Sequence, residues 1–172
     1  WMATDFTRER ILNADATTVS VGHYEGGVYN NYWVLIFSYP ENSHTEDYRQ
    51  EVLDLVNAQR AKYGLTALEM GNDALTAAAQ TRAEEIAVVN SHVRPDGSKC
   101  FTVLKDYGVT DTPTGENAAW GSVSPEEVVN AWMNSEGHRA NILNPEARKM
   151  SVGYYYNSTS TWGHQWIQIF TK

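Results

Sequence analysis

Two stretches of this chain match each other at an offset of 131 residues, which limits how the chain can divide into folding units. The matching segments open at Trp1 and at Trp132. Further matching pairs are Met2 with Met133, Arg8 with Arg139, Ile11-Leu12-Asn13 with Ile142-Leu143-Asn144, Ser20-Val21-Gly22 with Ser151-Val152-Gly153, and Tyr24 with Tyr155. With an adjustment of two residues, residues 33–37 match residues 166–170. Such self-similarity indicates that one arrangement of helix and strands occurs twice.

The two copies differ in length. Residues 1–40 match only the C-terminal part of the unit that fills residues 46–172, and residues 41–45 form a polar, turn-rich linker. We interpret residues 1–40 as the C-terminal half of a degenerate repeat, in which Thr7 stands where the second copy has His138. Because two strands and a helix are not stable alone, we expect this half to pack on the main unit or to self-associate with another copy. The chain opens in what reads as the middle of a helix, so we expect the natural start to lie upstream.

Composition narrows the class of protein. The chain has 172 residues, enough for one domain or one domain plus a fragment, and it has no apolar run long enough to span a bilayer. Its net charge is −8, and its basic residues are not clustered, which argues against nucleic acid and anionic membrane surfaces as partners. Cys100 is the only cysteine, so no internal disulfide can form. This neither proves nor excludes secretion.

Helix signals come first in residues 46–172 and strand signals come last. Ser43 and Glu46 have capping-box spacing, and Ser124-Pro125 is a second helix start with a cap and a proline at the first position. The expected elements are a first helix that ends at Gly64, a second from Leu75 to about Val89 capped by Asn72, a short helix near residues 101–107, a helix from Ser124 that ends by Gly137, and strands at residues 150–156 and 165–171. This order predicts a layered α+β domain.

Three segments supply candidate residues for chemistry. His92 precedes a Pro-Asp-Gly turn, Glu116 follows Gly115 before an apolar run, and His138 comes just after the predicted helix end, three residues from Ser135. Two imidazoles and one carboxylate suit a divalent metal or proton transfer. Each residue also has an ordinary explanation: a surface loop histidine, an edge-strand carboxylate, and an imidazolium at a helix C-terminus. Position alone does not choose between these alternatives.

Taken together, the motifs resemble the CAP superfamily, also called SCP-like or cysteine-rich secretory, antigen 5 and pathogenesis-related-1 domains. The resemblance is to the short bacterial branch and covers residues 46–172. The motifs that carry it are Leu55-Val56-Asn57-Ala58-Gln59-Arg60, Ser91-His92 with Arg94-Pro95-Asp96-Gly97, Gly115-Glu116-Asn117, Trp132-Met133-Asn134-Ser135, and Gly137-His138-Arg139-Ala140-Asn141-Ile142-Leu143. Five ordered motifs make chance agreement improbable.

The resemblance implies a three-layer α-β-α sandwich with a central, mainly antiparallel sheet. It also implies a cleft with a tetrad of two histidines and two acidic residues, of which His92, Glu116 and His138 would occupy three positions. The fourth position falls at Ser135, a known bacterial variation, so metal affinity should be lower than in the four-member form. Asn117 and Arg139 are the other expected cleft residues.

The resemblance further implies an extracellular or cell-surface location. Family members have been tied to zinc binding, to sterol or lipid binding, and to signalling or defence. We therefore expect a binding module whose cleft holds zinc, another divalent cation, or a small lipid-like or carbohydrate ligand, with an unidentified protein as a further partner. Two alternatives remain open: a metal-assisted, peptidase-like hydrolase with Glu116, His92 or His138 as catalytic residues, and a purely structural or adhesive repeat module. We expect binding rather than catalysis because no nucleophile or oxyanion-hole signature is present.

Overall fold

The computed structural model describes Met2, Arg8, Ile11, Leu12 and residues 18–38 and 45–172. The chain divides into two compact units, residues 1–43 and residues 44–172, and each is described by itself. The Ser43–Glu46 capping box lies outside the described residues and side chains. No helix in the described ranges is long and apolar enough to cross a membrane.

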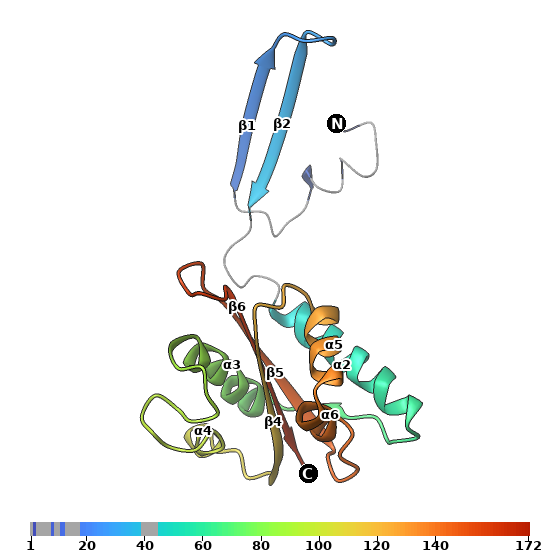
Figure 1. Cartoon of the computed structure of the whole chain (residues 1–172), viewed down its shortest axis with the longest axis vertical. Coiled ribbons are helices and arrows are strands. Elements are labelled where there is room, and N and C mark those ends of the chain that lie inside the picture. Colours follow the sequence, from blue (N-terminus) through green and yellow to red (C-terminus); the bar gives the residue numbers. More distant parts are fainter. Residues whose placement is uncertain (1, 3–7, 9–10, 13–17, 39–44) are drawn as a thin grey trace. The chain divides into compact units, whose positions relative to one another are not determined.

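The first unit contains a two-stranded antiparallel hairpin (Figure 1). Its strands are β1 (Thr18–Glu25) and β2 (Asn31–Ser38). Gly26, Gly27 and Asn30 in the turn have positive φ angles, a conformation that glycine and asparagine adopt at low cost. Many apolar side chains of the two strands are exposed, so the hairpin has no core of its own among the described residues.

The second unit is built on a four-stranded sheet with the strand order β3-β5-β6-β4. The strands are β3 (Glu69–Met70), β4 (Pro113–Trp120), β5 (Lys149–Tyr156) and β6 (His164–Thr171). The short β3 pairs with β5 in parallel, while β4–β6 and β5–β6 are antiparallel. The sheet is therefore mainly antiparallel, as the family resemblance implies.

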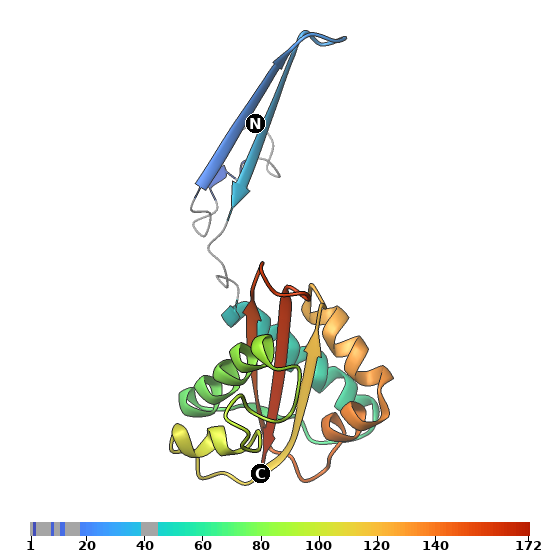
Figure 2. The ribbon, with the colours of Figure 1, turned by 60° about the vertical axis from the view of Figure 1, so that its left-hand side comes forward.

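Helices cover both faces of this sheet (Figure 2). They are α2 (Thr45–Lys62), α3 (Asp73–Val88), α4 (Thr102–Asp106), α5 (Pro125–Asn134) and α6 (Glu136–Ile142). One hydrophobic cluster joins α3 and α4 to one face, and a second joins α2, α5 and α6 to the other. The predicted three-layer α-β-α sandwich is confirmed.

The close fit of α3 on the sheet depends on small residues. Ala78, Ala79 and Ala83 are fully buried in the cluster beneath α3. A Cβ atom at Gly153 of β5 would overlap the carbonyl group of Ala79. Only glycine therefore allows the backbones of α3 and β5 to approach this closely.

Side-chain caps start two of the helices as predicted. The side chain of Asn72 accepts a hydrogen bond from the Leu75 N–H at 3.0 Å, and Ser124 accepts one from the Glu127 N–H at 3.3 Å. Each cap satisfies one of the donors that a helix N-terminus leaves unpaired, which stabilises a helix by about 1 kcal/mol.

The helix from Ser124 ends before Gly137, as predicted: α5 ends at Asn134, and the backbone of Ser135 is extended. The prediction that His138 comes just after a helix end is wrong, because a further helix, α6, begins at Glu136. His138 therefore lies in the first turn of α6, where the helix dipole disfavours an imidazolium instead of favouring it. Tyr154 of β5 is buried between Trp166 of β6 and Tyr48 of α2, the helix that covers this part of the sheet.

Candidate functional site

The centre of the candidate site is the carboxylate of Glu116 on β4. Its Oε2 accepts a hydrogen bond from Nε of Arg82 at 3.0 Å, and its Oε1 lies 3.3 Å from Nη2 of the same guanidinium. Arg82 extends from α3 and is fully buried, and Glu116 is 6% exposed. Two opposite charges are thus removed from water together, which is tolerable because each satisfies the other.

His92 connects this buried pair to the surface. Its Nδ1 lies 2.8 Å from Oε1 of Glu116, and because a carboxylate only accepts, Nδ1 is the donor. The hydrogen bond to Glu116 raises the pKa of His92, outweighing burial and the charge of Arg82. The imidazole is nevertheless 56% exposed. Nδ1 is therefore engaged, while the ring itself remains accessible.

The charge network continues away from His92. Arg82 donates from Nη1 to Glu85 at 2.7 Å, Glu85 accepts from Arg94 at 2.7 Å, and Arg94 reaches Asp106 at 2.8 Å. Charges of opposite sign alternate along this series, so each side chain fixes the next. Arg94, part of the motif that follows His92, thus anchors the loop to α3 and α4.

Asn117 connects the strand to the second histidine. Strand alternation places its side chain on the opposite face of β4 from Glu116. Its Nδ2 donates to the carbonyl oxygen of His138 at 3.1 Å and to Oε1 of Gln168 at 3.0 Å, and its Oδ1 accepts from Asn141 at 2.9 Å. This amide cluster, in which Asn117 and Gln168 are fully buried, holds the first turn of α6 against the sheet. Asn117 therefore positions His138 through its backbone.

Gly115 makes room for the same cluster. A Cβ atom at this position would lie 2.6 Å from Oδ1 of Asn141, which is closer than packed atoms approach. Asn141 in turn donates to the carbonyl oxygen of Glu116 at 3.2 Å. Each residue of the Gly115-Glu116-Asn117 motif thus has a separate physical role: space, charge and amide hydrogen bonding.

His138 is the second imidazole of the site. Burial lowers its pKa, and the positive charge of His92 lowers it further. The two histidines are anchored to adjacent residues of β4, His92 to Glu116 and the backbone of His138 to Asn117, and their pKa values shift in opposite directions. The site combines a more basic exposed histidine with a less basic, half-buried one.

The remaining predicted cleft residues have different positions. Ser135 lies at the junction between α5 and α6, and its side chain makes no capping hydrogen bond to α6. Nη1 of Arg139 donates to the carbonyl oxygen of Met133 at 3.0 Å, so its guanidinium stabilises the end of α5. No hydrogen bond or ion pair that the structure records in residues 45–172 joins Ser135 or Arg139 to His92.

Glu116 does not fit the role of a metal ligand in this arrangement. Both of its oxygens already accept hydrogen bonds from Arg82 and His92. Within the described ranges, no group of three or more His, Cys, Asp or Glu side chains is arranged to hold a metal ion. A carboxylate that orients a histidine through Nδ1 does match the partner that metal-binding histidines usually have. The three-ligand site therefore stays a prediction, and the geometry fits a supporting role for Glu116 better.

Cys100 has the environment of a structural thiol. It is buried, and burial together with the negative charge of Glu116 raises its pKa to about 11. Since only the thiolate is a nucleophile, the side chain is unreactive near neutral pH.

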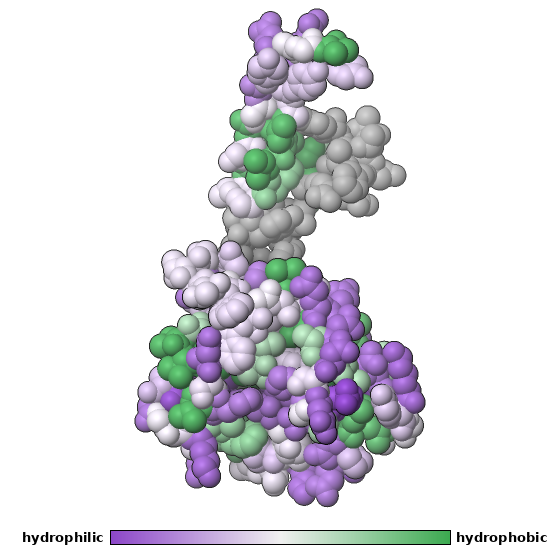
Figure 3. All heavy atoms as spheres, viewed as in Figure 1, coloured by the Kyte–Doolittle hydropathy of each residue, from purple (hydrophilic) through white to green (hydrophobic). Residues whose placement is uncertain are grey.

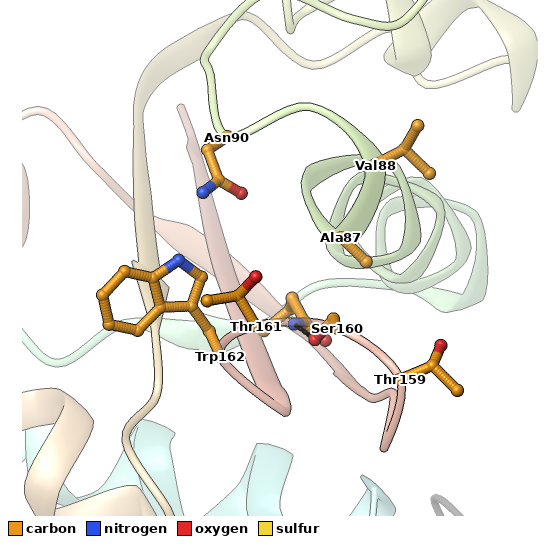
Figure 4. A pocket seen from close by; sticks show the side chains of 8 residues that line it. Ala87, Val88, Asn90, Thr159, Ser160, Thr161 and Trp162 are labelled. Carbon is orange, nitrogen blue, oxygen red and sulfur yellow. Dashed lines mark hydrogen bonds between the residues drawn. The ribbon is translucent and has the colours of Figure 1, made fainter.

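A hollow of about 430 Å³ lies between the end of α3 and the loop that joins β5 to β6 (Figure 4). Asn90 and Trp162 border it, together with the hydroxyl side chains of that loop. None of its lining residues belongs to the predicted site. The sequence contains no motif that marks this hollow, because it is formed by two segments that are distant in the chain.

Sequence reasoning also missed Arg82 and Glu85. Both are charged residues in an alanine-rich helix, three positions apart and therefore neighbours on one side of it. A fully buried arginine needs a partner. The burial that creates this requirement is visible only in the structure, where Glu116 from another segment reaches α3.

The chain belongs to the CAP family: its residues 53–170 match the family model described as the cysteine-rich secretory protein family. An uncharacterized protein, YkwD, of Bacillus subtilis is 40% identical over 127 residues, which are 73% of this chain and 49% of that protein. An uncharacterized membrane protein, YlbC, of the same organism is 36% identical over 107 residues, which are 60% of this chain and 30% of that protein. The chain thus spans about half or less of the length of these relatives.

Solved bacterial structures share the fold. An extracellular protein containing an SCP domain from Bacillus anthracis has a TM-score of 0.68 and 24% identity, covering 81% of this chain and 47% of that one. An outer surface protein of Borrelia burgdorferi has a TM-score of 0.63 and 25% identity, covering 77% of this chain and 96% of that one. These similarities agree with the sandwich described above.

Proposed function

We propose that this protein is an extracellular or surface-located CAP-family binding module that contacts its ligand through the face formed by His92 and His138. One observation carries the proposal: an exposed imidazole is held by a carboxylate that is itself buried and paired with Arg82. The extracellular and outer-surface structural relatives support the location.

The arrangement favours binding because His92 is oriented before any ligand arrives. The hydrogen bond from Nδ1 to Glu116 fixes both the tautomer and the plane of the ring. Glu116 cannot easily move, because Arg82 and the packing of α3 hold it. A group that is already ordered loses less entropy on binding, which favours affinity.

The ligand chemistry follows from Nε2 of His92, the ring nitrogen that is not bonded to Glu116. With Nδ1 protonated, Nε2 of neutral His92 has a lone pair available for a divalent cation or for a hydrogen-bond donor of a small ligand. His138, whose lowered pKa keeps it neutral near pH 7, supplies a second imidazole. His92 and His138 would hold a cation such as zinc, which would supply a Lewis-acid centre for a ligand when bound. With Glu116 in a supporting role, we expect modest affinity.

Hydrolysis is less well supported by the same geometry. Glu116 is buried and bonded on both oxygens, so it lacks free access to a substrate proton. Cys100 is protonated and buried, so it offers no nucleophile. A screen of peptide and ester substrates tests this alternative: turnover by the wild type that Glu116→Gln abolishes would favour a hydrolase.

Zinc titration calorimetry at about pH 7.5, where free imidazoles are neutral, tests the proposal. We expect a binding signal with a micromolar dissociation constant that disappears in the His92→Ala/His138→Ala double variant. The control is His23→Ala, which changes a histidine in the hairpin outside the site. No heat in the wild type, or equal heat in the double variant, would contradict cation binding at this face.

A further inference from the structure

The strand pairing of the β1–β2 hairpin is the same as that of β5–β6 in the main unit. Gly22 faces Val34 as Gly153 faces Ile167. The correspondence extends over all eight pairs, from Thr18–Ser38 and Lys149–Thr171 to Glu25–Asn31 and Tyr156–His164. The two-residue difference between the copies falls entirely within the turns. Since a one-residue slip would turn every side chain to the other face, shared register means shared faces.

In the main unit, this pair of strands is covered on every side. β3 and β4 bond to the outer edges of β5 and β6. α3 packs on one face and α2 on the other. As a result, Trp166, Ile167 and Ile169 are all 0% exposed. The pattern of apolar residues on both faces is that of an interior pair of strands.

The equivalent side chains of the hairpin are open to solvent. Trp33, Val34 and Ile36 are 54%, 56% and 62% exposed. On the face of the hairpin that Figure 3 presents, apolar side chains lie together. Within residues 18–38 and 45–172, no further strand pairs with the outer edge of β1 or β2. An exposed apolar face with free edges is a surface suited to an added strand and helix.

One glycine indicates what kind of element fits on this surface. Gly153 gives room to the backbone of α3 at Ala79, and a Cβ atom there would overlap it. Gly22 occupies the same register position in the hairpin, yet no atom of the described residues lies within 4 Å of where its Cβ would be. The hairpin thus has room at Gly22 for a helix packed as closely as α3 is at Gly153, but no helix among the described residues occupies that room. Gly in a strand often marks such an approach of another backbone.

We propose that the β1–β2 hairpin is a docking surface for a CAP-type first half: an alanine-rich helix like α3 that crosses Gly22, and a strand like β4 that extends the sheet beside β2. The main unit's own first half is not this occupant, because its Ala78 and Ala79 are fully buried against β5–β6. For the same reason, an intact second copy offers no free helix of this kind. The inference is independent of the His92 site.

A chain that carries a second first half tests the proposal. Residues 45–131 of this protein are joined ahead of residue 1 in the full-length chain, so that the hairpin can complete a second unit. We expect amide exchange in β1 and β2 to slow by about tenfold or more, since these amides would enter a cooperative sheet. Emission from Trp33 should shift to shorter wavelength as the ring becomes buried.

Two substitutions in the joined chain make the result specific. Gly22→Val should abolish the gain in protection, because a side chain there would meet the incoming helix. Val28→Thr, at the 89% exposed tip of the hairpin, should leave the gain unchanged. A second design replaces residues 149–171 of the main unit with residues 18–38. Cooperative unfolding of this variant, lost in its Gly22→Val form, would support the same docking mode without relying on the joined chain.

Three results would overturn the proposal. The first is a combination of two outcomes. Amide exchange in β1 and β2 is unchanged in a soluble joined chain, and the variant with residues 149–171 replaced does not unfold cooperatively. Another is full protection of the hairpin amides from exchange in the unmodified chain when its mass in solution is that of a dimer. This result would assign the surface to a second copy of the chain. The third is protection that Gly22→Val does not affect, which would exclude a helix across Gly22.

Discussion

Nδ1 of His92 donates a hydrogen bond of 2.8 Å to Oε1 of Glu116, so an exposed loop residue is bonded directly to a carboxylate in the interior. Glu116 is held by Arg82, and Arg82 by Glu85. Through this series, the orientation of the accessible ring depends on the packing of α3 against the sheet. Substitution of a residue in this series should therefore change the stability of the protein or the pKa of His92.

Removal of Arg82 should destabilise the protein strongly. Arg82→Met leaves Glu116 and Glu85 without their buried partner, and we expect a loss of about 3–5 kcal/mol in the free energy of unfolding. Urea denaturation measures it. Lys105→Met, at an exposed position of α4, should change stability by less than about 0.5 kcal/mol. If the Arg82→Leu/Glu116→Leu double variant were no more stable than Arg82→Met, the unpaired charge would not be the cause.

The pKa shift of His92 predicts a pH-dependent contribution to stability. Because the folded-state pKa is raised, the contribution is fully present below the unfolded value near 6.5 and is lost as pH rises through the folded-state pKa. Relative to His92→Gln, the wild type should therefore melt at a higher temperature in mild acid than in mild alkali. Melting curves across this range measure the difference. His23→Gln is the control, and a difference that grows toward alkali would contradict the assignment.

Gly153 and Gly22 form a matched pair for testing the packing of α3. Gly153→Ala introduces a Cβ that overlaps the backbone at Ala79, so we expect a loss of stability of about 1–3 kcal/mol or more. Gly22→Ala adds the same atom where none of the residues described in the structure comes within 4 Å, and it should leave the main unfolding transition unchanged. Chemical denaturation of both variants gives the comparison. Equal effects would mean that α3 does not rest on Gly153.

Cys100 should react only when the protein unfolds. Burial raises its pKa to about 11, so at mildly alkaline pH the native thiol is protonated and covered. We expect alkylation of the native chain to be at least about tenfold slower than alkylation in denaturant, where the thiol has its ordinary pKa. Mass spectrometry follows the modification. Comparable rates in both states would show that the loop around Cys100 is open.

The sequence predicts the fold well where the signals are local. Asn72 and Ser124 start helices by capping, and both strands of the β5–β6 hairpin are close to their expected bounds. The helix from Ser124 ends before Gly137 as predicted, but the position of His138 was wrong, because α6 begins directly after the extended Ser135 and no residue pattern marks this junction. The histidines and Glu116 were found as motifs, but Arg82 was not. Its role exists only through contact between segments 34 positions apart.

Imidazole NMR titration of the wild type, Glu116→Gln and His92→Gln tests the central claim most directly. In the wild type, His92 should titrate above about 6.5 and His138 below it. Glu116→Gln should lower the pKa of His92, and His92→Gln should raise that of His138 by removing a nearby charge. Zinc should shift the signals of both rings and leave His23 unchanged. If His92 and His138 instead titrate alike, independently of Glu116 and of each other, the two rings do not form one site.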